Sequence, residues 1–464
     1  MEKGYKNLEL ELNLLALDNR PCSYKYFQYI CDQSGIKRNI FFSRKEIFEK
    51  YNKQNNNKKL KKIFILSLDN FIFDGIVNSR KIEYLQRREN FKILEELFNF
   101  IEIKKEFDFY LYVSIPRILL NFKDNIEKIW DINLKLSQNF SEKVEKLLEN
   151  YQKYNDFRSN EEFYILSCRR EKLKIIDFIL ANFLKKRLKN IKEILVVLDD
   201  SQIKGLNFLE LRYLKKNFSN FYYLIGLDEV HLLIFAKIIL ELVMKTKVIN
   251  FFSDIDLKYK VPLYESVSIV KLLKIYEKYL KIKFNKVEGS DYFWKIFETK
   301  KQRESIDQIN QIRFECFNKF LDYFEKLCSY EIKGRYIVDL TFANGASLGV
   351  LKYFFDDWNR ILDVKGFWAW NTFANTLGSS LSHYIISKNL GVVNDEIEKK
   401  LVIENFLETV YQTFIRHFAS KYLWDERKIK EAYQDLFKRF KTENVKIKKL
   451  YLPWNRYFEI DVRI

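Results

Sequence analysis

Glycine and proline are scarce in this chain, with 12 Gly and 4 Pro among 464 residues. Their scarcity excludes collagen-like, Gly/Ser-linker and Pro-rich architectures. Hydrophobic residues make up 47% and charged residues 31%, so the chain can bury a core, and global disorder is excluded. All four prolines (Pro21, Pro116, Pro262 and Pro453) lie in short polar and aromatic segments, and several glycines flank the acidic and amide segments discussed below. We therefore expect these residues to mark loops with special backbone geometry.

Cysteine and histidine are also few, with five Cys and three His. The cysteines are odd in number and form no C-x-x-C pair, which argues against a disulfide framework or a zinc ribbon and predicts a cytoplasmic location. Three histidines are too few for a His-rich metal centre. Neither G-x-G-x-x-G nor a P-loop sequence occurs, which disfavours dinucleotide and NTP binding. The sequence thus predicts no metal and no cofactor.

Long apolar runs are missing as well, because no stretch of about 18 apolar residues occurs. The most apolar stretch, residues 230–243, contains His231, Lys237 and Glu241 and is typical of a core helix. The N-terminus has no apolar signal-peptide core. Neither a membrane partner nor a secretory leader is therefore expected.

Positive charge is in excess, since 81 Lys and Arg against 63 Asp and Glu give a formal charge of +18. The abundant Lys, Asn, Ile, Phe and Tyr use A/T-rich codons, so genome composition accounts for this excess. Basic and acidic residues are interleaved along the chain, as on solvated helix faces. A nucleic-acid partner is not expected, because it would require a basic groove and an affinity that falls steeply with salt. The expected partner is a small-molecule or oligosaccharide substrate.

Short apolar runs alternate with longer amphipathic stretches, a pattern typical of an α/β fold with parallel strands. The predicted fold is a (β/α)-barrel-like parallel sheet with a helical C-terminal extension, and an open doubly wound sheet is the alternative. Residues 1–390 are assigned to the barrel-like domain and residues 391–464 to a helical segment packed on it. Connections are expected at 53–62 and 283–304. The predicted strands span residues 12–17, 63–68, 109–114, 164–167, 194–198, 222–226, 248–252 and 335–340.

Polar residues follow most of these apolar runs, at the strand ends where α/β enzymes place their sites. A single carboxylate after a strand is often only a helix N-cap. Charged residues at seven strand ends in one chain are harder to explain by capping, so we expect them to share a site. Candidates at the first, second and last of the predicted strand ends are Asp18, Arg20, Asp69, Arg80, Asp339 and Asn344.

Two pairs of adjacent carboxylates occur, Asp199-Asp200 and Asp228-Glu229. Neighbouring carboxylates interact, so their pKa values separate and one can remain protonated as a general acid. Glycoside hydrolysis needs such a pair, and in its substrate-assisted form one carboxylate orients the substrate acetamide while the other protonates the leaving oxygen. Residues 224–230 are similar to the Asp-Glu strand end of family 20 hexosaminidases, and Leu198-Asp199-Asp200 resembles the Asp-Asp pair of family 84 enzymes.

The segment 366–378 combines aromatic and amide side chains, including Trp370, Asn371 and Asn375. Indole faces stack on sugar rings, and carboxamides form hydrogen bonds with hydroxyls in both directions, which suits carbohydrate binding. The alternative interpretation is a helix start capped by Asn371, with Asn375 one turn later. His383 and the serines near it lack a G-x-S-x-G sequence, so a serine hydrolase is disfavoured.

Several ordered segments carry a resemblance that covers almost the whole chain. They are Leu17-Asp18-Asn19-Arg20-Pro21-Cys22; Ser67-Leu68-Asp69 with Gly75 and Ser79-Arg80; Asp199-Asp200 with Gly205 and Glu210; Asp228-Glu229; Asp339 with Ala343-Asn344-Gly345; Trp370-Asn371-Thr372 with Asn375-Thr376-Leu377-Gly378; and Pro453-Trp454-Asn455-Arg456 with Phe458-Glu459. In these segments the chain resembles a bacterial family known as domain of unknown function 4127. It departs from the family pattern at Asp74-Gly75, where paired glycines are usual, and at residues 169–172, where an Arg-x-Arg-Asn-like stretch is usual. The family name assigns no biochemistry, so the resemblance transfers no catalytic role.

Three hypotheses follow from these residues. The first is a glycosidase-like hydrolase acting on an N-acetylated amino-sugar glycoside, in which Asp199 orients the acetamide, Asp200 is the general acid/base, and Asp228-Glu229 is the competing catalytic pair. The second is a non-catalytic sugar- or metabolite-binding protein without a carboxylate pair within about 10 Å. The third is a metal-dependent hydrolase with Asp18, Asp69, Asp199 and Asp228 as ligands. Substrate-binding residues are expected to be Asp18, Arg20, Asp69, Arg80, Asp339, Asn344, Trp370, Asn371 and Asn375.

Overall fold

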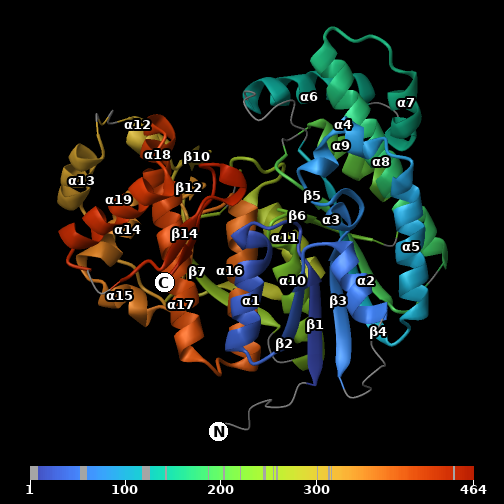
Figure 1. Ribbon diagram of the computed structural model, residues 1–464. Coiled ribbons are helices and arrows are strands. Elements are labelled where there is room, and N and C mark those ends of the chain that lie inside the picture. Colours follow the sequence, from blue (N-terminus) through green and yellow to red (C-terminus); the bar gives the residue numbers. More distant parts are fainter. Residues whose placement is uncertain are drawn as a thin grey trace.

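The computed structural model has an α/β fold with parallel sheets, as the sequence predicts (Figure 1). It describes residues 9–52, 60–117, 126–141, 144–186, 188–201, 204–219, 221–243, 247–253, 255–257, 260–299, 301–311, 314, 316–442 and 445–464. The strands in this part of the chain form open sheets and no closed barrel, in agreement with the doubly wound alternative.

The first sheet has six parallel strands in the order β2-β1-β3-β4-β5-β6. Its central strands are buried almost throughout, and their sequences are correspondingly continuous apolar runs. The chain reverses its direction of travel across the sheet between β1 and β3, the kind of position where open α/β sheets bind ligands. The strands are β1 Leu10–Leu15, β2 Lys37–Phe41, β3 Lys61–Ser67, β4 Phe107–Ile115, β5 Ile191–Leu198 and β6 Tyr222–Ile225.

The second sheet has five parallel strands, and it repeats the strand order of the first. Its order is β13-β11-β9-β7-β8. As in the first sheet, the second strand in the chain, β8, lies on one side of the first, β7, and the later strands follow on the other side of β7. The reversal in this sheet falls between β7 and β9. The strands are β7 Val248–Ser253, β8 Lys283–Lys286, β9 Tyr292–Ile296, β11 Tyr336–Leu340 and β13 Gly366–Trp368; two short pairs are β10 Arg303–Glu304 with β12 Phe342–Ala343, and β14 Lys449–Tyr451 with β15 Asp461–Arg463.

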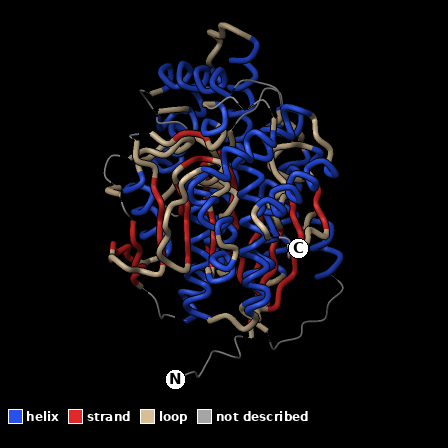
Figure 2. The backbone as a smooth tube through the Cα atoms, turned by 90° about the vertical axis from the view of Figure 1, so that its left-hand side faces the viewer, coloured by secondary structure: helices blue, strands red, loops and turns tan. Residues whose placement is uncertain are grey.

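Helices surround the strands, and a helical group at the top of Figure 1 lies beyond the first sheet. In Figure 2 the top of the molecule likewise consists of helices and loops. No helix within the described ranges is both long enough and apolar enough to cross a membrane. The helices are α1 Pro21–Gln33, α2 Arg44–Asn52, α3 Leu68–Phe73, α4 Ile82–Leu85, α5 Glu89–Ile103, α6 Ile126–Phe140, α7 Leu147–Lys153, α8 Asn160–Lys186, α9 Leu206–Asn217, α10 Val230–Val243, α11 Ile269–Leu280, α12 Asp307–Asn310, α13 Phe317–Lys326, α14 Leu348–Asp356, α15 Asn359–Asp363, α16 Phe373–Leu390, α17 Asp395–Val410, α18 Arg416–Tyr422 and α19 Glu426–Arg439.

Helices α10 and α16 connect the two sheets by packing against each other. Nearly every residue of α10 is buried, because this helix is apolar on all sides. The second sheet separates two hydrophobic clusters, since successive side chains of a strand point to opposite faces. Tyr292 and Trp294 belong to the cluster shared with the first sheet, whereas Phe293 between them belongs to the cluster formed with the C-terminal helices.

The C-terminal segment returns to the first helix of the chain, and Figure 1 shows α1 beside α16 and α17. The contact contains Lys25, whose ammonium group is fully buried. It donates to Glu408 Oε1 at 2.5 Å, Asp461 Oδ1 at 3.0 Å and the carbonyl of Val462 at 2.8 Å, and it lies 2.9 Å from Glu404 Oε2. Lys25 thus pairs with the buried carboxylates of α17 and β15, and Arg463 pairs with Asp461 as well, at 3.0 Å.

Two sequence predictions of secondary structure are wrong. The expected strand at 164–167 lies inside α8, because four apolar residues fit one side of a long helix as well as they fit a strand. The expected connection at 283–304 contains strands β8, β9 and β10. The loop predicted at 53–62 lies mostly outside the described residues, and β3 begins at Lys61. The division of the chain at residue 390 stays a prediction.

Replacing Lys25 by methionine should destabilise the fold strongly, because Glu404, Glu408 and Asp461 would lose their buried cation. We expect the free energy of unfolding, measured by urea denaturation at pH 7, to fall by about 3–5 kcal/mol. Lys61→Met is the matched control, since Lys61 pairs with Asp108 at an exposed position and should cost less than about 1 kcal/mol. Equal losses in the two variants would contradict the role assigned to Lys25.

Candidate functional site

The carboxyl ends of the strands in both sheets contribute polar side chains to one group, here called the strand-end cluster. Loops after β1, β3, β4, β5 and β6 supply its members from the first sheet, and loops after β7, β9, β11 and β13 supply those from the second. The C-terminal segment adds Glu459. The cluster consists of Asp18, Arg20, Arg80, Arg117, Asp199, Asp200, Asp228, Tyr264, Glu265, Glu304, Asn344, Asn371, Asn375 and Glu459.

Arg20 lies at the centre of one half of this cluster. Its guanidinium donates to three carboxylates: Nε to Asp18 at 2.9 Å, Nη2 to Asp228 at 2.8 Å and Nη1 to Glu459 at 3.1 Å. Burial lowers the pKa of Arg20, but the charges of Asp18 and Asp228 outweigh it and raise the pKa above its ordinary value. Pro21 follows directly and starts α1, so the arginine is fixed at a helix start.

Asp228 is held from the other side by amides that follow β13. The side-chain amide of Asn371 donates to Asp228 Oδ2 at 3.0 Å, and the backbone N–H of Asp228 donates to Asn375 Oδ1 at 3.2 Å. Asn375 also donates to the side-chain oxygen of Asn371 at 3.3 Å. Asn371 Oδ1 accepts from the backbone N–H of Thr372 at 2.7 Å. Thr372, and not Asn371, is the N-cap of α16, so the expectation that Asn371 caps this helix is wrong.

Asp199 and Asp200 follow β5 and face two arginines. Arg80 donates to Asp199 Oδ2, which also accepts from the backbone N–H of Arg117 at 2.9 Å. The guanidinium of Arg117 donates to Asp200 Oδ2 at 2.6 Å. Each guanidinium therefore pairs with one member of the carboxylate pair. Arg117 contacts both members, Asp199 through its backbone N–H and Asp200 through its side chain.

The two neighbouring carboxyls differ in acidity. Burial raises the pKa of Asp199, but the charges of Arg80 and Arg117 prevail and hold it below its ordinary value. For Asp200, burial together with the charges of Asp199 and Asp228 prevails over Arg117 and raises the pKa to about 7. Near neutral pH, Asp199 is ionised while Asp200 is present in both its protonated and its ionised form.

Further acids in and beside the cluster are shifted in the same direction as Asp200. Burial, with the charges of Asp228 and Asp18, raises the pKa of Glu459 to about 7. Burial, with the charges of Asp200 and Asp199, raises the pKa of Glu265 to about 8, although its Oε1 accepts from the backbone N–H of Ala374 at 3.0 Å. The cluster can therefore hold and release protons between pH 7 and 8.

Glu229, by contrast, is packed away from the cluster. It is 1% exposed, and no donor in the described structure bonds to either carboxyl oxygen. A side chain at Gly226 or Gly378 would collide with it, with closest approaches of 2.4 Å in both cases. Burial, followed by the charge of Asp228, raises its pKa well above the ordinary value. Glu229 is thus packed in the interior, and the pair Asp228-Glu229 does not present two carboxyl groups to a ligand.

Tyr264, Glu304 and Asn344 form the part of the cluster on the second sheet. Tyr264 donates to Glu304, and the amide of Asn344 donates to both oxygens of Glu304 at 3.0 and 3.1 Å. Burial and the charge of Glu304 raise the pKa of Tyr264, and the charge of Asp200 adds to this shift. Tyr264 and Asn344 have left-handed backbone, with φ of 70° and 57°, a strain that is concentrated at functional sites.

Three residues predicted to bind substrate have other roles in the structure. Asp69 is fully buried, paired with Lys172, and accepts from the backbone and side chain of Ser114 at 2.8 and 2.9 Å. Asp339 is fully buried and accepts from two backbone N–H groups of its own loop, Thr341 and Ser347. Trp370 is 7% exposed and donates to the hydroxyl of Tyr26, so its ring faces lie in the core and do not fit a sugar platform.

Several members of the cluster were not among the sequence candidates. Arg117 follows a predicted strand end, and Glu459 lies in the last segment of the family resemblance, so signals for both existed. Tyr264, Glu265 and Glu304 had none. Tyr264 and Glu265 lie well beyond the end of the predicted strand at 248–252, and Glu304 lies in the short strand β10. Trp454 is a further addition: it is 38% exposed, with φ of 56°, and the Arg20 guanidinium lies 5.3 Å from its ring centroid.

The donor set of the cluster does not favour a metal. Among the described residues, no three His, Cys, Asp or Glu side chains are grouped so that they could hold a metal ion. Asp18, one of the four aspartates in the metal hypothesis, accepts from Arg20 and from the hydroxyl of Ser23 at 2.7 Å. The arrangement is suited to hydrogen bonding and proton transfer.

Replacing Glu265 by glutamine should make stability less dependent on pH. A carboxyl whose pKa is raised on folding contributes stability at low pH, and this contribution is lost as pH rises from the unfolded value near 4.3 through the folded value. With the pKa of Glu265 at about 8, wild-type stability should fall between pH 5 and 8. In Glu265→Gln this fall should be smaller by about 3 kcal/mol in urea unfolding. An unchanged slope, or the same change in the exposed control Glu102→Gln, would contradict the assignment.

Comparison with known proteins gives one family and no individual relative. The family described as Protein of unknown function (DUF4127) matches residues 12–463. Comparisons with curated proteins and with solved structures gave no match. Since the matched residues include both sheets, the strand-end cluster and the C-terminal segment, the chain belongs to the DUF4127 family.

Proposed function

We propose that the protein is a glycoside hydrolase that acts on an N-acetylated amino-sugar glycoside at the strand-end cluster. The observation that carries this proposal is the difference between Asp199 and Asp200. One carboxyl of the pair is held ionised by two arginines, and its neighbour has a pKa of about 7. Substrate-assisted glycoside hydrolysis needs these two states side by side.

In the proposed reaction Asp200 is the general acid/base. Its protonated carboxyl donates to the leaving oxygen as the glycosidic bond breaks, and its carboxylate then takes a proton from the attacking water. Asp199 accepts a hydrogen bond from the substrate acetamide and directs the acetamide oxygen toward the anomeric carbon. Arg80 and Arg117 fix the two carboxyls in position.

Substrate hydroxyls would be bound by the other members of the cluster. Asn371, Asn375 and Asn344 offer amides that donate and accept, and Asp228 offers a carboxylate anchored by Arg20. Trp454 takes the place of Trp370 as the exposed indole at this position.

The carboxylate pair favours this proposal over a non-catalytic binding protein. Sugar binding without catalysis has no use for an acid poised near neutral pH, whereas a general acid works best when its pKa lies close to the working pH. The five cysteines are all free thiols, which supports a cytoplasmic location as part of the proposal.

Replacing Asp200 by asparagine should abolish most hydrolysis, because the general acid/base is lost while the side-chain shape is kept. We expect kcat/KM on an aryl N-acetylglucosaminide, assayed as both anomers, to fall by about 100- to 10,000-fold. Asp177→Asn, which removes a carboxylate bonded to Tyr213 on the outer helix α8, is the matched control and should keep full activity. Full activity in Asp200→Asn, or no turnover of either anomer by the wild type, would overturn the proposal.

The pH dependence gives a second test of the same assignment. Because Asp200 must be protonated in the first step, kcat/KM should decline as pH rises through about 7. Arg117→Met removes an opposing positive charge and should move this decline to higher pH. A decline that stays in place in Arg117→Met would show that another group titrates.

A further inference from the structure

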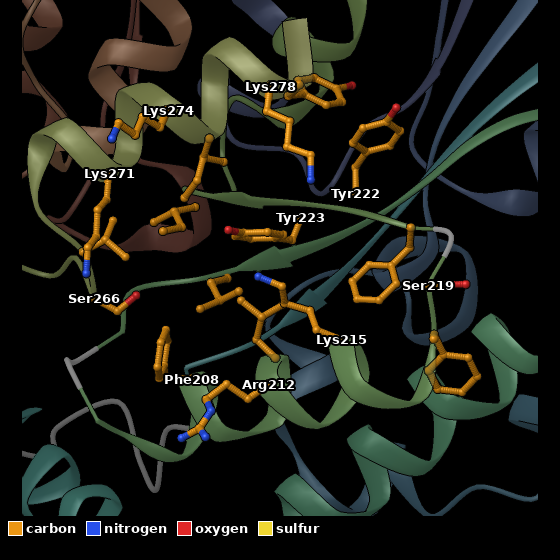
Figure 3. Close-up of a pocket in the computed structure, with 18 of the residues that line it drawn as sticks. Phe208, Arg212, Lys215, Ser219, Tyr222, Tyr223, Ser266, Lys271, Lys274 and Lys278 are labelled. Atoms are coloured by element: carbon orange, nitrogen blue, oxygen red, sulfur yellow. The ribbon is translucent and has the colours of Figure 1, made fainter. Parts of the chain in front are cut away.

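A groove of about 770 Å³ lies at the outer edge of the first sheet. No member of the strand-end cluster lines it, although Leu198 and Ser266 of its lining are next in the chain to Asp199 and Glu265. Strand β6 forms its floor, and helices α9 and α11 form its walls, as Figure 3 shows. Since β6 is the last strand of the sheet, the groove runs beside a strand with only one neighbour in that sheet. Its size is within the range of about 300–1,000 Å³ that is typical of ligand sites.

All charged residues that line the groove are positive. They are Lys204, Arg212, Lys215, Lys271, Lys274 and Lys278. In the whole chain, by contrast, 63 acidic residues accompany the 81 basic ones. None of the six cations forms an ion pair with a described carboxylate. The groove therefore concentrates positive charge that no carboxylate in the described part of the chain pairs with.

The spacing of these cations is costly for the helices that carry them. Lys271, Lys274 and Lys278 lie three and four residues apart on one face of α11, where like charges repel. The acids of the same helices point elsewhere: Glu210 of α9 binds Arg169, and Glu277 of α11 accepts from the backbone N–H of Phe284. A ligand with negative charge would remove this repulsion.

Aromatic rings lie between the two rows of cations. Tyr222 and Tyr223 project from β6, and Phe208 projects from α9 (Figure 3). These three rings are partly exposed, and the ammonium of Lys215 lies 4.1 Å from the ring centroid of Tyr223. Among the residues that the structure describes, the lining contains no carboxylate and no side-chain amide, which are the groups that bind sugar hydroxyls. Cations with ring faces suit a ligand made of phosphates and flat bases.

We propose that this groove binds single-stranded nucleic acid without strong sequence preference. The lysines of α11 and the basic residues of α9 contact successive phosphates, and bases stack on the rings of Phe208, Tyr222 and Tyr223. Single-strand sites combine a basic groove with aromatic platforms in this way. A duplex would keep its bases stacked inside and leave the rings unused. The proposal concerns a second site and does not depend on hydrolysis at the strand-end cluster.

The test measures binding of a fluorescently labelled 20-nucleotide oligo(dT) to the full chain by fluorescence anisotropy, between 50 and 200 mM salt. Wild-type affinity should fall steeply with salt, because each phosphate contact releases a counterion. Replacing Lys271, Lys274 and Lys278 together by glutamine should weaken binding at least tenfold. It should also reduce the slope of log affinity against log salt by about 2.

The control removes the same charge elsewhere. Lys92, Lys105 and Lys399 are exposed lysines outside the groove, and their triple glutamine variant should bind almost as the wild type does. Phe208→Leu tests stacking: it keeps an apolar helix residue, and it should lower affinity about tenfold without changing the salt slope.

Four results would overturn the proposal. The first is no binding of oligo(dT) at 50 mM salt, and the second is an equal loss of affinity in the groove and control triple variants. The third is equal affinity for a duplex of the same length, which would indicate charge attraction alone. The fourth is binding of poly-glutamate or of an acidic oligosaccharide in preference to oligo(dT), which would assign the groove to another class of polyanion.

Discussion

The buried guanidinium of Arg20 is the constraint on which the arrangement of this protein depends. It joins the loop after β1 to the loop after β6 and to the C-terminal segment, through Asp18, Asp228 and Glu459. A charge with so little exposure is tolerated only when it is paired and hydrogen-bonded, so the three segments must meet at one point. Lys25, further along α1, imposes the same requirement on α17 and β15. Arg20 and Lys25, which lie close together in the sequence, therefore fix the position of the C-terminal segment against α1.

This pairing also sets the acidity of the site. The charges of Arg80 and Arg117 hold Asp199 ionised. Asp200 pairs with the guanidinium of Arg117 but also experiences the negative charges of Asp199 and Asp228. The pKa of Asp200 is therefore raised by its neighbours as well as by burial. Because Asp228 is itself fixed by Arg20 and Asn371, the field at Asp200 depends on residues from both sheets. Neither sheet alone could produce the difference between the two adjacent carboxyls.

The sequence predicts the parallel strands with continuous apolar runs, because a strand buried on both faces has no polar positions to obscure it. It misses the edge strands β2 and β8, which are mostly polar, and β13, which has three residues. It also misses the buried strand β9, which lies inside the predicted connection at 283–304. Candidates after the detected strands, such as Asp18 and Asp228, do converge, since parallel strands bring their carboxyl ends to one edge. Glu304 and Glu459 could not be placed, because their positions depend on packing between distant segments. Residue type alone favours Trp370 as a site residue, whereas its packing shows that the indole is buried and that its N–H donates to the hydroxyl of Tyr26.

The charges behind the net charge of +18 are mixed along the sequence but are separated by sign at one place in the fold. Interleaved Lys, Arg, Asp and Glu predict solvated helix faces, and for most of the surface ion pairs between neighbours agree with this. A helix, however, sorts an interleaved sequence into faces, so α9 and α11 can turn their acids inward or aside and their lysines toward β6. Codon usage can raise the number of lysines, but it cannot decide which face they occupy. The segregation of charge at the edge of the first sheet therefore has to be explained by the fold or by a ligand, and the fold gains nothing from like charges held together.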